Sequence, residues 1–196
     1  GCPYCSNQSS TPEVRILAEL QSIFDKVVSR HKERGLEVDI FLKNLSIGIE
    51  YDGSYYHKNK IDRDFAKNSA LKELGIRLIR VREAPLTPLS EFDICVNQKG
   101  LTKNDINQLV RRILDAAGGS ICDETICNAL HYQRQSEFVN EKLFKSYIAC
   151  FPSPLPGNAL EFTHPKIAGE WHPSKNHPLS PKNFTPGSNE KIWWIC

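Results

Sequence analysis

The sequence predicts a mixed α/β protein with a sheet-containing core and an irregular C-terminal tail. Two neighbouring runs, 37–42 and 46–52, are rich in β-branched and aromatic residues and have strand character. A helical pattern and a further apolar strand follow them, which is the order of a βαβ unit. From residue 151 onward, prolines interrupt the chain repeatedly. We therefore expect four segments: a short N-terminal piece at 1–10, a core at 11–100, a helical extension at 101–150 and a proline-rich tail at 151–196.

The elements of the core can be justified in chain order. Thr11-Pro12-Glu13 combines a hydroxyl side chain, a proline and an acid, which is typical of a helix start, and apolar residues then recur at helical spacing for about three turns. The next stretch, 26–32, is compatible with more helix or with a strand. The residues 61–74 predict a helix that ends at Gly75, and 76–82 predict a strand that runs parallel to its partner in the preceding hairpin.

Beyond the predicted strand, the pattern is mostly helical. We expect an irregular connection over 85–100, followed by helices at 104–116, 123–131 and 137–149. In the tail, Trp171, Trp193 and Trp194 are the expected anchors of a small module.

Bulk composition narrows the class of protein. The chain has 196 residues, 40% of them hydrophobic, and a net charge of +2, which suits a globular protein and does not by itself indicate a nucleic-acid partner. Basic residues gather after the predicted hairpin, at Lys58, Lys60, Arg63, Lys67, Arg77, Arg80 and Arg82, and favour a polyanionic partner. No apolar run approaches membrane-spanning length, and no signal peptide is recognisable.

Cysteine usage suggests a reducing compartment. The seven cysteines form no regular disulfide framework, and Cys2 and Cys5 form a C-x-x-C pair that is typical of a metal knuckle. We expect a cytoplasmic protein in which Cys95, Cys122, Cys127 and Cys150 are small buried residues. The absence of methionine indicates that the chain starts inside a longer polypeptide or has been processed.

The most informative feature is a group of acidic residues on the predicted hairpin. If Lys43-Asn44 is a two-residue turn, Asp39 faces Gly48, and side-chain alternation places Asp39, Glu50 and Asp52 on one face. Gathering like charges is costly unless a cation neutralises them. Carboxylate oxygens suit a hard divalent ion, so we expect Mg²⁺, or Mn²⁺ in its place. The alternative is a solvated acidic face on an ordinary hairpin.

Several stretches together resemble a known nuclease family. They are Thr-Pro-Glu at 11–13, Val-Asp-Ile-Phe at 38–41, Ile-Glu-Tyr-Asp-Gly-Ser-Tyr-Tyr-His at 49–57, Asp64 with Lys67, and Leu-Lys-Glu-Leu-Gly-Ile-Arg-Leu-Ile-Arg-Val-Arg-Glu at 71–83. In this order they resemble the PD-(D/E)XK nucleases, and more closely the very-short-patch-repair endonuclease branch. The resemblance implies a restriction-endonuclease-like αβββαβ core, which makes 26–32 the first strand.

The resemblance also implies roles for individual residues. Asp39 matches the metal-binding aspartate, and Glu50 matches the acid of the D/E-x-K element. Asp52 stands where that element has its lysine, so the usual partner of the phosphate is missing from this position. The backbone carbonyl of Tyr51 is a further candidate ligand.

Other matched residues offer substitutes for the missing lysine. Lys67 lies three residues after Asp64 on the same face of the predicted helix, from which it can reach the phosphate. His57 matches the histidine of this branch and can exchange protons near neutral pH. Glu13 matches an acid that often completes the metal shell. The alternatives are a surface lysine, a packing histidine and a helix-dipole acid.

The two ends of the chain resemble a second family. Thr-His-Pro-Lys-Ile-Ala-Gly-Glu-Trp-His-Pro-Ser-Lys-Asn at 163–176, Leu-Ser-Pro at 179–181 and Pro-Gly-Ser-Asn-Glu-Lys-Ile-Trp-Trp-Ile-Cys at 186–196 resemble the first half of a treble-clef-like zinc-ribbon repeat. Gly-Cys-Pro-Tyr-Cys at 1–5 is similar to the end of its second half. The resemblance implies Zn²⁺ as a second metal, with thiolate ligands at Cys2, Cys5 and Cys196.

These observations together predict a Mg²⁺-dependent DNA endonuclease that acts in restriction, defence or repair. Two other classes of function stay open. The chain can be a nucleic-acid-binding module that keeps the fold without catalysis, or a protein-interaction scaffold built from the ribbons and helices. Acidic residues facing a polyanion argue against a binding module, because carboxylates without a cation repel phosphate. The form of the DNA and the oligomeric state do not follow from the sequence.

Overall fold

A computed structural model describes residues 10–58, 60–98, 100–149, 157–177, 179–186, 188 and 191–195. The chain divides into two compact units, one formed by 11–144 and the other by 1–10 with 145–196. In the described residues, no helix is both long enough and apolar enough to cross a lipid bilayer.

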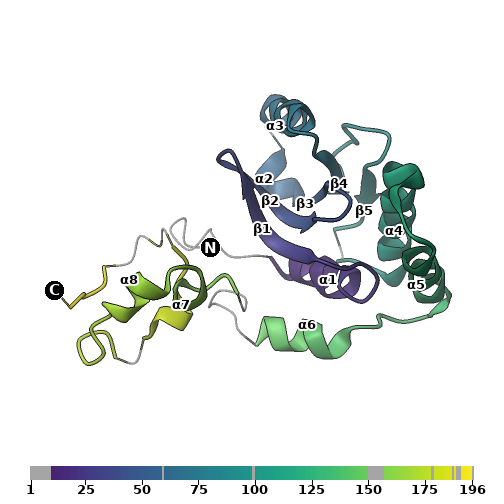
Figure 1. Ribbon diagram of the computed structural model, residues 1–196. Coiled ribbons are helices and arrows are strands. Elements are labelled where there is room, and N and C mark those ends of the chain that lie inside the picture. Colours follow the sequence, from purple (N-terminus) through teal and green to yellow (C-terminus); the bar gives the residue numbers. More distant parts are fainter. Residues whose placement is uncertain are drawn as a thin grey trace. The chain divides into compact units, whose positions relative to one another are not determined.

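The larger unit is built on one five-stranded mixed sheet (Figure 1). Its strands lie in the order of the sequence: β1 (Val27–Glu33), β2 (Leu36–Leu42), β3 (Ile47–Asp52), β4 (Arg77–Glu83) and β5 (Ile94–Val96). Strands β1 to β3 are antiparallel, whereas β4 runs parallel to β3 and β5 runs parallel to β4. The expected mixed α/β class and the parallel connection between β3 and β4 are confirmed, and residues 26–32 belong mainly to strand β1 rather than to a helix.

Helices cover both faces of this sheet (Figure 1). The helices of the larger unit are α1 (Thr11–Leu20), α2 (Ser54–His57), α3 (Ile61–Glu73), α4 (Lys103–Ala117), α5 (Asp123–Arg134) and the first half of α6 (Glu141–Ile148), with a 3₁₀ turn η1 at Gly118–Ser120. On one side of the sheet, α1 and α4 bury an apolar core, and α3 lies on the other side.

The face under α3 changes character along the strands. Near the start of β4 it is apolar, with a core of Val38, Phe41, Leu71, Ile76 and Leu78. Gly48 permits the close packing there, because a Cβ atom at this position would lie 2.7 Å from a Val38 methyl group and 2.9 Å from a Leu78 methyl group. Toward the other end of β3 and β4, buried charged side chains replace the apolar ones, namely Glu50, Asp52, Arg80 and Arg82. This polar end is the region of interest for function.

Some predicted elements differ from the structure. Ile47 pairs with Leu42 and Gly48 pairs with Phe41, so a four-residue loop over 43–46 replaces the expected two-residue turn. Ser46, with φ +51°, occupies the left-handed region in this loop. Residues 85–100, which were expected to be irregular, contain strand β5. This strand has three residues, too few to show an alternation of apolar and polar side chains.

The side chain of Glu19 on α1 forms hydrogen bonds with the helical extension. Its carboxylate is fully buried and accepts hydrogen bonds from Tyr132 Oη at 2.8 Å and from the backbone N–H groups of Val139 at 2.9 Å and Asn140 at 3.2 Å. The Arg15 guanidinium lies 3.4 Å from the centre of the Phe144 ring. Helix α5 and the start of α6 are therefore part of the larger unit.

In its described part, the smaller unit contains only short elements. They are α7 (Leu160–Thr163), α8 (Pro165–Gly169), a 3₁₀ turn η2 (Pro181–Asn183) and one bridge between Trp171 and Trp194. The side chain of Asn176 donates to the carbonyl of Trp193 at 2.8 Å and accepts from its N–H at 2.9 Å. Trp171 is buried against Phe184, as expected of an anchor, whereas Trp193 and Trp194 are exposed.

Candidate functional site

The candidate site lies at the carboxyl end of β3, between the sheet and α3. Glu50 and Asp52 point to the α3 side because side chains two apart on a strand share a face. On the parallel neighbour β4, Arg80 is in register with Glu50, and Arg82 is in register with Asp52. Sequence alternation on two paired strands thus brings two acids and two arginines together.

Asp52 is the centre of an ion-pair network. Nη1 of Arg80 lies 2.8 Å from Asp52 Oδ1, and Nη1 of Arg82 lies 3.0 Å from Asp52 Oδ2. All three side chains are buried. Arg82 Nη1 also lies 3.5 Å from the Asp64 carboxylate on α3. Burial favours the neutral form of an arginine, but the surrounding carboxylates, Glu50 first, outweigh it and raise the pKa of Arg80.

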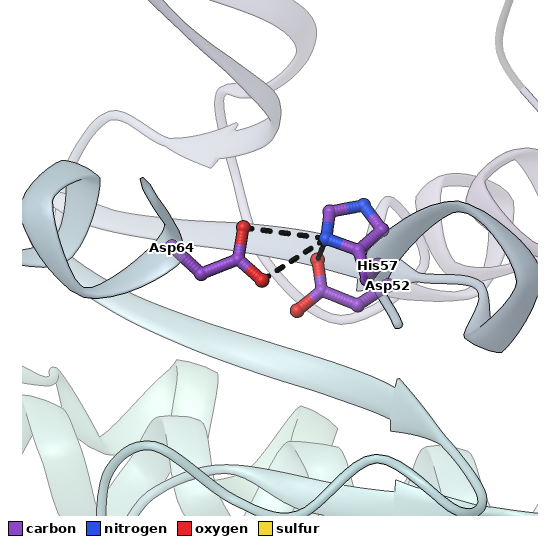
Figure 2. Close-up of side chains that lie close together, drawn as sticks. All are labelled: Asp52, His57 and Asp64. Atoms are coloured by element: carbon purple, nitrogen blue, oxygen red, sulfur yellow. Dashed lines mark hydrogen bonds and ion pairs between the residues drawn. The ribbon is translucent and has the colours of Figure 1, made fainter. Parts of the chain in front are cut away.

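His57 is oriented by an acid on α3 (Figure 2). Its Nδ1 lies 3.1 Å from one oxygen of Asp64 and 3.3 Å from the other, and 3.5 Å from Asp52 Oδ1. The second ring nitrogen, Nε2, points away from both carboxylates. An imidazole that donates its Nδ1–H to a carboxylate holds Nε2 as the acceptor, which is the tautomer needed to take a proton from water.

Asp39 lies where the sheet is distorted. The ladder between β1 and β2 passes from Ser29–Ile40 to His31–Val38, and the intervening Arg30 has φ +52°. On the other side, the ladder between β2 and β3 ends at Ile40–Ile49. Asp39 Oδ2 then accepts the backbone N–H of Tyr51 at 3.1 Å. A carboxylate therefore takes the place of a backbone acceptor between these two strands.

The backbone of Tyr51 indicates which side of β3 its carbonyl group faces. In an extended strand, the N–H and C=O groups of one residue point to the same side. Because the Tyr51 N–H points at Asp39, its carbonyl faces the same gap. The side chain of Tyr51 lies on the opposite face of the sheet, and its hydroxyl group lies 3.4 Å from Glu83.

The surroundings of Asp39 and Glu50 raise the pKa values of both carboxyl groups. Burial raises the pKa of Asp39 to about 7, and the nearby Glu13 carboxylate contributes to the same shift. Burial and the nearby Asp39 raise the pKa of Glu50 to about 7, against the opposing effects of Arg80 and Lys67. Desolvation combined with a second carboxylate disfavours two negative charges in one place. A divalent cation would remove that penalty.

Lys67 provides a cation at this pair of acids. It lies one turn after Asp64 on α3, and its Nζ forms an ion pair with Glu50 Oε1. The other oxygen of Glu50 lies 2.9 Å from Arg80 Nη1. The structure thus places Lys67 beside Glu50, while its expected contact with a phosphate stays a prediction.

The predicted residues thus form two neighbouring groups. Asp39 and Glu50, with Glu13 and Lys67 nearby, form one group at the gap between β2 and β3. Asp52, His57 and Asp64 form the other, and their ligand-type atoms lie within 4.8 Å of one another. In the second group two guanidinium groups already neutralise the carboxylates, so an added divalent ion would meet strong repulsion.

The donors of the first group fit a hard divalent cation. Two carboxylates and a backbone carbonyl supply oxygen ligands only, as Mg²⁺ and Mn²⁺ prefer. Among the described residues, no arginine or lysine of the sheet forms an ion pair with Asp39. Asp52, in contrast, pairs with both Arg80 and Arg82. We therefore assign the candidate divalent site to Asp39, Glu50 and the Tyr51 carbonyl, and treat Asp52 as a partner of the arginines.

The sequence did not indicate the role of Arg80 and Arg82. We expected them to favour a polyanionic partner, but their side chains are buried and neutralise the acids of the site. A signal was present, since Arg80 and Arg82 alternate with apolar residues in a strand that follows the acidic strand. Exposed basic residues do occur beside the site, at Lys58, Lys60 and Arg63.

Glu83 was also not predicted as a site residue. Its carboxylate accepts hydrogen bonds from the backbone N–H of Ser54 at 2.8 Å and from the Ser54 hydroxyl at 2.7 Å. These bonds fix the start of α2, the short helix that ends at His57. Glu83 therefore helps to position the candidate catalytic histidine.

The predicted zinc ligands Cys2, Cys5 and Cys196 lie outside the described residues. Three of the other cysteines, Cys95, Cys122 and Cys127, were expected to be buried, but all three are exposed. They lie on a short strand near the sheet edge and on or next to α5, where the core does not reach. Cys150 is outside the described residues.

Comparison with known proteins gave one match, at the end of the chain. Residues 167–196 match a family model described as "Probable Treble clef zinc finger domain". This match agrees with the zinc-ribbon resemblance of the tail and supports Zn²⁺ as a ligand of that segment. Searches of curated proteins and of solved structures each gave no match to this chain.

Proposed function

We propose that this protein is a metal-dependent DNA endonuclease with a PD-(D/E)XK-type core of the very-short-patch-repair branch. The observation that carries the proposal is geometric: Asp39 accepts the N–H of Tyr51, Glu50 pairs with Lys67, and His57 Nδ1 lies 3.1 Å from Asp64 at the same end of the sheet. The order α1, β1, β2, β3, α3, β4 supports the same core.

The residues have complementary tasks in phosphodiester hydrolysis. Asp39, Glu50 and the Tyr51 carbonyl would hold a divalent ion, which would supply Lewis acidity to the phosphate and to the attacking water. His57, fixed by Asp64, accepts a proton from water at Nε2 or returns one to the leaving oxygen. Lys67 offsets the negative charge that grows on the phosphate. Glu13 adds negative charge beside Asp39 and favours ion binding.

The buried charges around position 52 give a physical reason for the absence of the motif lysine there. A lysine at this position would lie against two buried guanidinium groups, where an acid is needed to neutralise them. Lys67 brings the missing ammonium group from α3 instead. The departure from the motif is thus accompanied by a compensating lysine, which favours catalysis over a binding function alone.

A surface suited to DNA adjoins His57. Tyr55 and Tyr56 precede it on α2 and are 87% and 66% exposed, with their rings 5.2 Å apart edge to face. Phe65 on α3 is also exposed, and the exposed basic residues Lys58, Lys60 and Arg63 lie between Tyr56 and Phe65 in the sequence. Exposed rings stack on bases, and basic side chains bind the phosphate backbone. We include DNA as the partner in the proposal.

The zinc-finger segment would add a second DNA or protein contact. It matches a family of zinc modules, and the smaller unit to which it belongs exposes Trp193 beside Lys175, whose Nζ lies 4.5 Å from the ring centre. Restriction, defence against foreign DNA and repair are the processes that use such an enzyme.

The test is cleavage of supercoiled plasmid and of single-stranded DNA with Mg²⁺, with Mn²⁺ and with chelator. We expect metal-dependent cutting that Asp39→Ala abolishes. Asp62→Ala is the matched control, because Asp62 is an exposed acid on the same helix as Lys67 and should cut like the wild type.

The alternative function is a nucleic-acid-binding module without catalysis. The two arginines at Asp52 favour it, since their ion pairs alone would maintain the fold at this place. DNA binding without cutting under every metal condition would support that alternative and contradict the proposal.

A further inference from the structure

Both oxygens of Glu50 are already engaged by cations. Lys67 Nζ is paired with Oε1, and Arg80 Nη1 lies 2.9 Å from Oε2. Glu50 is also one of the two carboxylates assigned to the divalent ion. The ion therefore cannot take Glu50 as a ligand with full strength unless one of these two cations moves away.

Arg80 is fixed in place. Its side chain is fully buried, and three further groups hold it: Asp52 Oδ1 at 2.8 Å, Asn68 Oδ1 at 2.9 Å and the backbone carbonyl of Asp64 at 3.4 Å. A shift of Arg80 would break all of these bonds and leave Asp52 without one of its two arginine partners. Arg80 is not the cation that leaves.

Lys67 is held by fewer contacts than Arg80. Its side chain is 27% exposed, and Glu50 is the partner that its Nζ has among the described residues. An ammonium group on a flexible chain is well hydrated and can exchange an ion pair for water at low cost. The helix α3 presents it at the surface next to the exposed basic residues that would meet DNA.

We propose that Lys67 is a resident counter-ion of the Asp39–Glu50 pair, which a divalent ion displaces from Glu50 and so releases for the phosphate of the substrate. The proposal rests on the metal-dependent function described above. In the absence of a divalent ion, Lys67 neutralises one of the two acids. When the ion binds, its two positive charges repel the ammonium group outward, where the DNA backbone arrives.

This exchange has a functional consequence. Lys67 is withheld from the phosphate until the ion is in place, so the protein binds DNA less tightly at this point when it cannot cut. It also sets the affinity for the ion, since each binding event must break the Lys67–Glu50 pair. If Lys67 served only the fold, its replacement by alanine would leave the affinity for the ion unchanged or would lower it.

Calorimetric titration with Mn²⁺ in the absence of DNA tests the exchange directly. We expect Lys67→Ala to bind Mn²⁺ about tenfold tighter than the wild type, because a competing positive charge has gone. Lys67→Arg keeps the charge and should show no such gain. Lys72→Ala, a change of an exposed lysine on the same helix, should bind like the wild type. Equal or weaker binding by Lys67→Ala would overturn the proposal.

Lysine labelling of the wild type gives a second readout. An acylating reagent, with the products analysed by mass spectrometry, should modify Lys67 several times faster after Mn²⁺ is added, while Lys72 reacts at the same rate. Unchanged labelling of Lys67 with bound Mn²⁺ would contradict displacement and leave the proposed function intact. No Mn²⁺ binding by the wild type would overturn both the exchange and the metal-dependent function.

Discussion

Arg80 Nη1 lies 2.8 Å from Asp52 Oδ1, and both side chains are buried between the sheet and α3. This pair occupies the place where the resemblance to the nuclease family would put a lysine. The structure thus separates two tasks within one acidic cluster. Asp52 pairs with both buried arginines, whereas Asp39 and Glu50 are the acids whose pKa values are raised, Glu50 even though it pairs with Lys67 and Arg80.

The first prediction concerns the stability of this network. Asp52→Ala should lower the free energy of unfolding by about 3–5 kcal/mol, because it removes the carboxylate that two buried guanidinium groups share. Urea unfolding followed by circular dichroism measures the change. Asp62→Ala, at an exposed position, should change the free energy by less than about 0.5 kcal/mol. Full stability of Asp52→Ala together with lost ion binding would instead make Asp52 a metal ligand.

The second prediction concerns the His57–Asp64 pair. Asp64→Asn should reduce the cleavage rate about 10²- to 10⁴-fold, because the amide no longer holds the tautomer that leaves Nε2 free to accept a proton. His57→Ala should have a loss of similar size, measured under single-turnover conditions with saturating metal.

A double variant separates catalysis from folding in this pair. If Asp64 acts through His57, Asp64→Asn combined with His57→Ala should be no slower than His57→Ala alone. If the two losses in cleavage rate multiply in the double variant, the two residues act independently. Urea unfolding of Asp64→Asn serves as a control for stability, because Asp64 also lies 3.5 Å from Arg82.

Alternation along the strands made part of this site predictable. The predicted hairpin register was wrong by two residues, yet a shift of two leaves Glu50 and Asp52 on one face, because side chains alternate with a period of two. The prediction that these acids share one face therefore did not depend on the predicted turn, which was wrong. The helix that carries Asp64 and Lys67 followed from its apolar spacing and its closing glycine.

Other features depend on tertiary packing and were not predictable from one sequence. Nothing in the pattern of Arg80 and Arg82 says that α3 covers them and makes them partners of acids. The distortion at Arg30 and Asp39 also has no local signal, because Arg30 carries no glycine-like preference for a positive φ. Strand β5 has three residues, too few to show a period.

The third prediction concerns pH. Folding raises the pKa values of Asp39 and Glu50 from the ordinary carboxylate range to about 7, so the folded state binds more protons than the unfolded state between about pH 4 and pH 7. Without divalent ions, the free energy of unfolding should therefore fall as the pH rises through this window and level off above it.

A variant isolates the contribution of one acid. Asp39→Asn has no proton to lose there and should be more stable than the wild type by about 1–3 kcal/mol at pH 8 in chelator. Mg²⁺ should stabilise the wild type at pH 8 and have little effect on the variant. Urea unfolding at pH 5, 6, 7 and 8 measures both effects. Parallel curves for the two proteins would refute a raised pKa at Asp39.

The fourth prediction concerns the aromatic surface on α2. Tyr55→Ala should weaken DNA binding about tenfold, because an 87% exposed ring is available to stack on a base and each stacked base is worth about 1–3 kcal/mol. Tyr55→Phe keeps the ring and should bind nearly as well as the wild type. Fluorescence anisotropy with a labelled single-stranded oligonucleotide in chelator measures affinity without cutting.

The matched control for Tyr55 lies on another helix of the same unit. Leu130 on α5 is 47% exposed, and Leu130→Ala should leave DNA affinity unchanged. Equal losses for Tyr55→Ala and Leu130→Ala would indicate a general effect on folding rather than a contact. An unchanged affinity for Tyr55→Ala, with cleavage intact, would place the DNA on a different surface and leave the basic residues Lys58, Lys60 and Arg63 to be tested in its place.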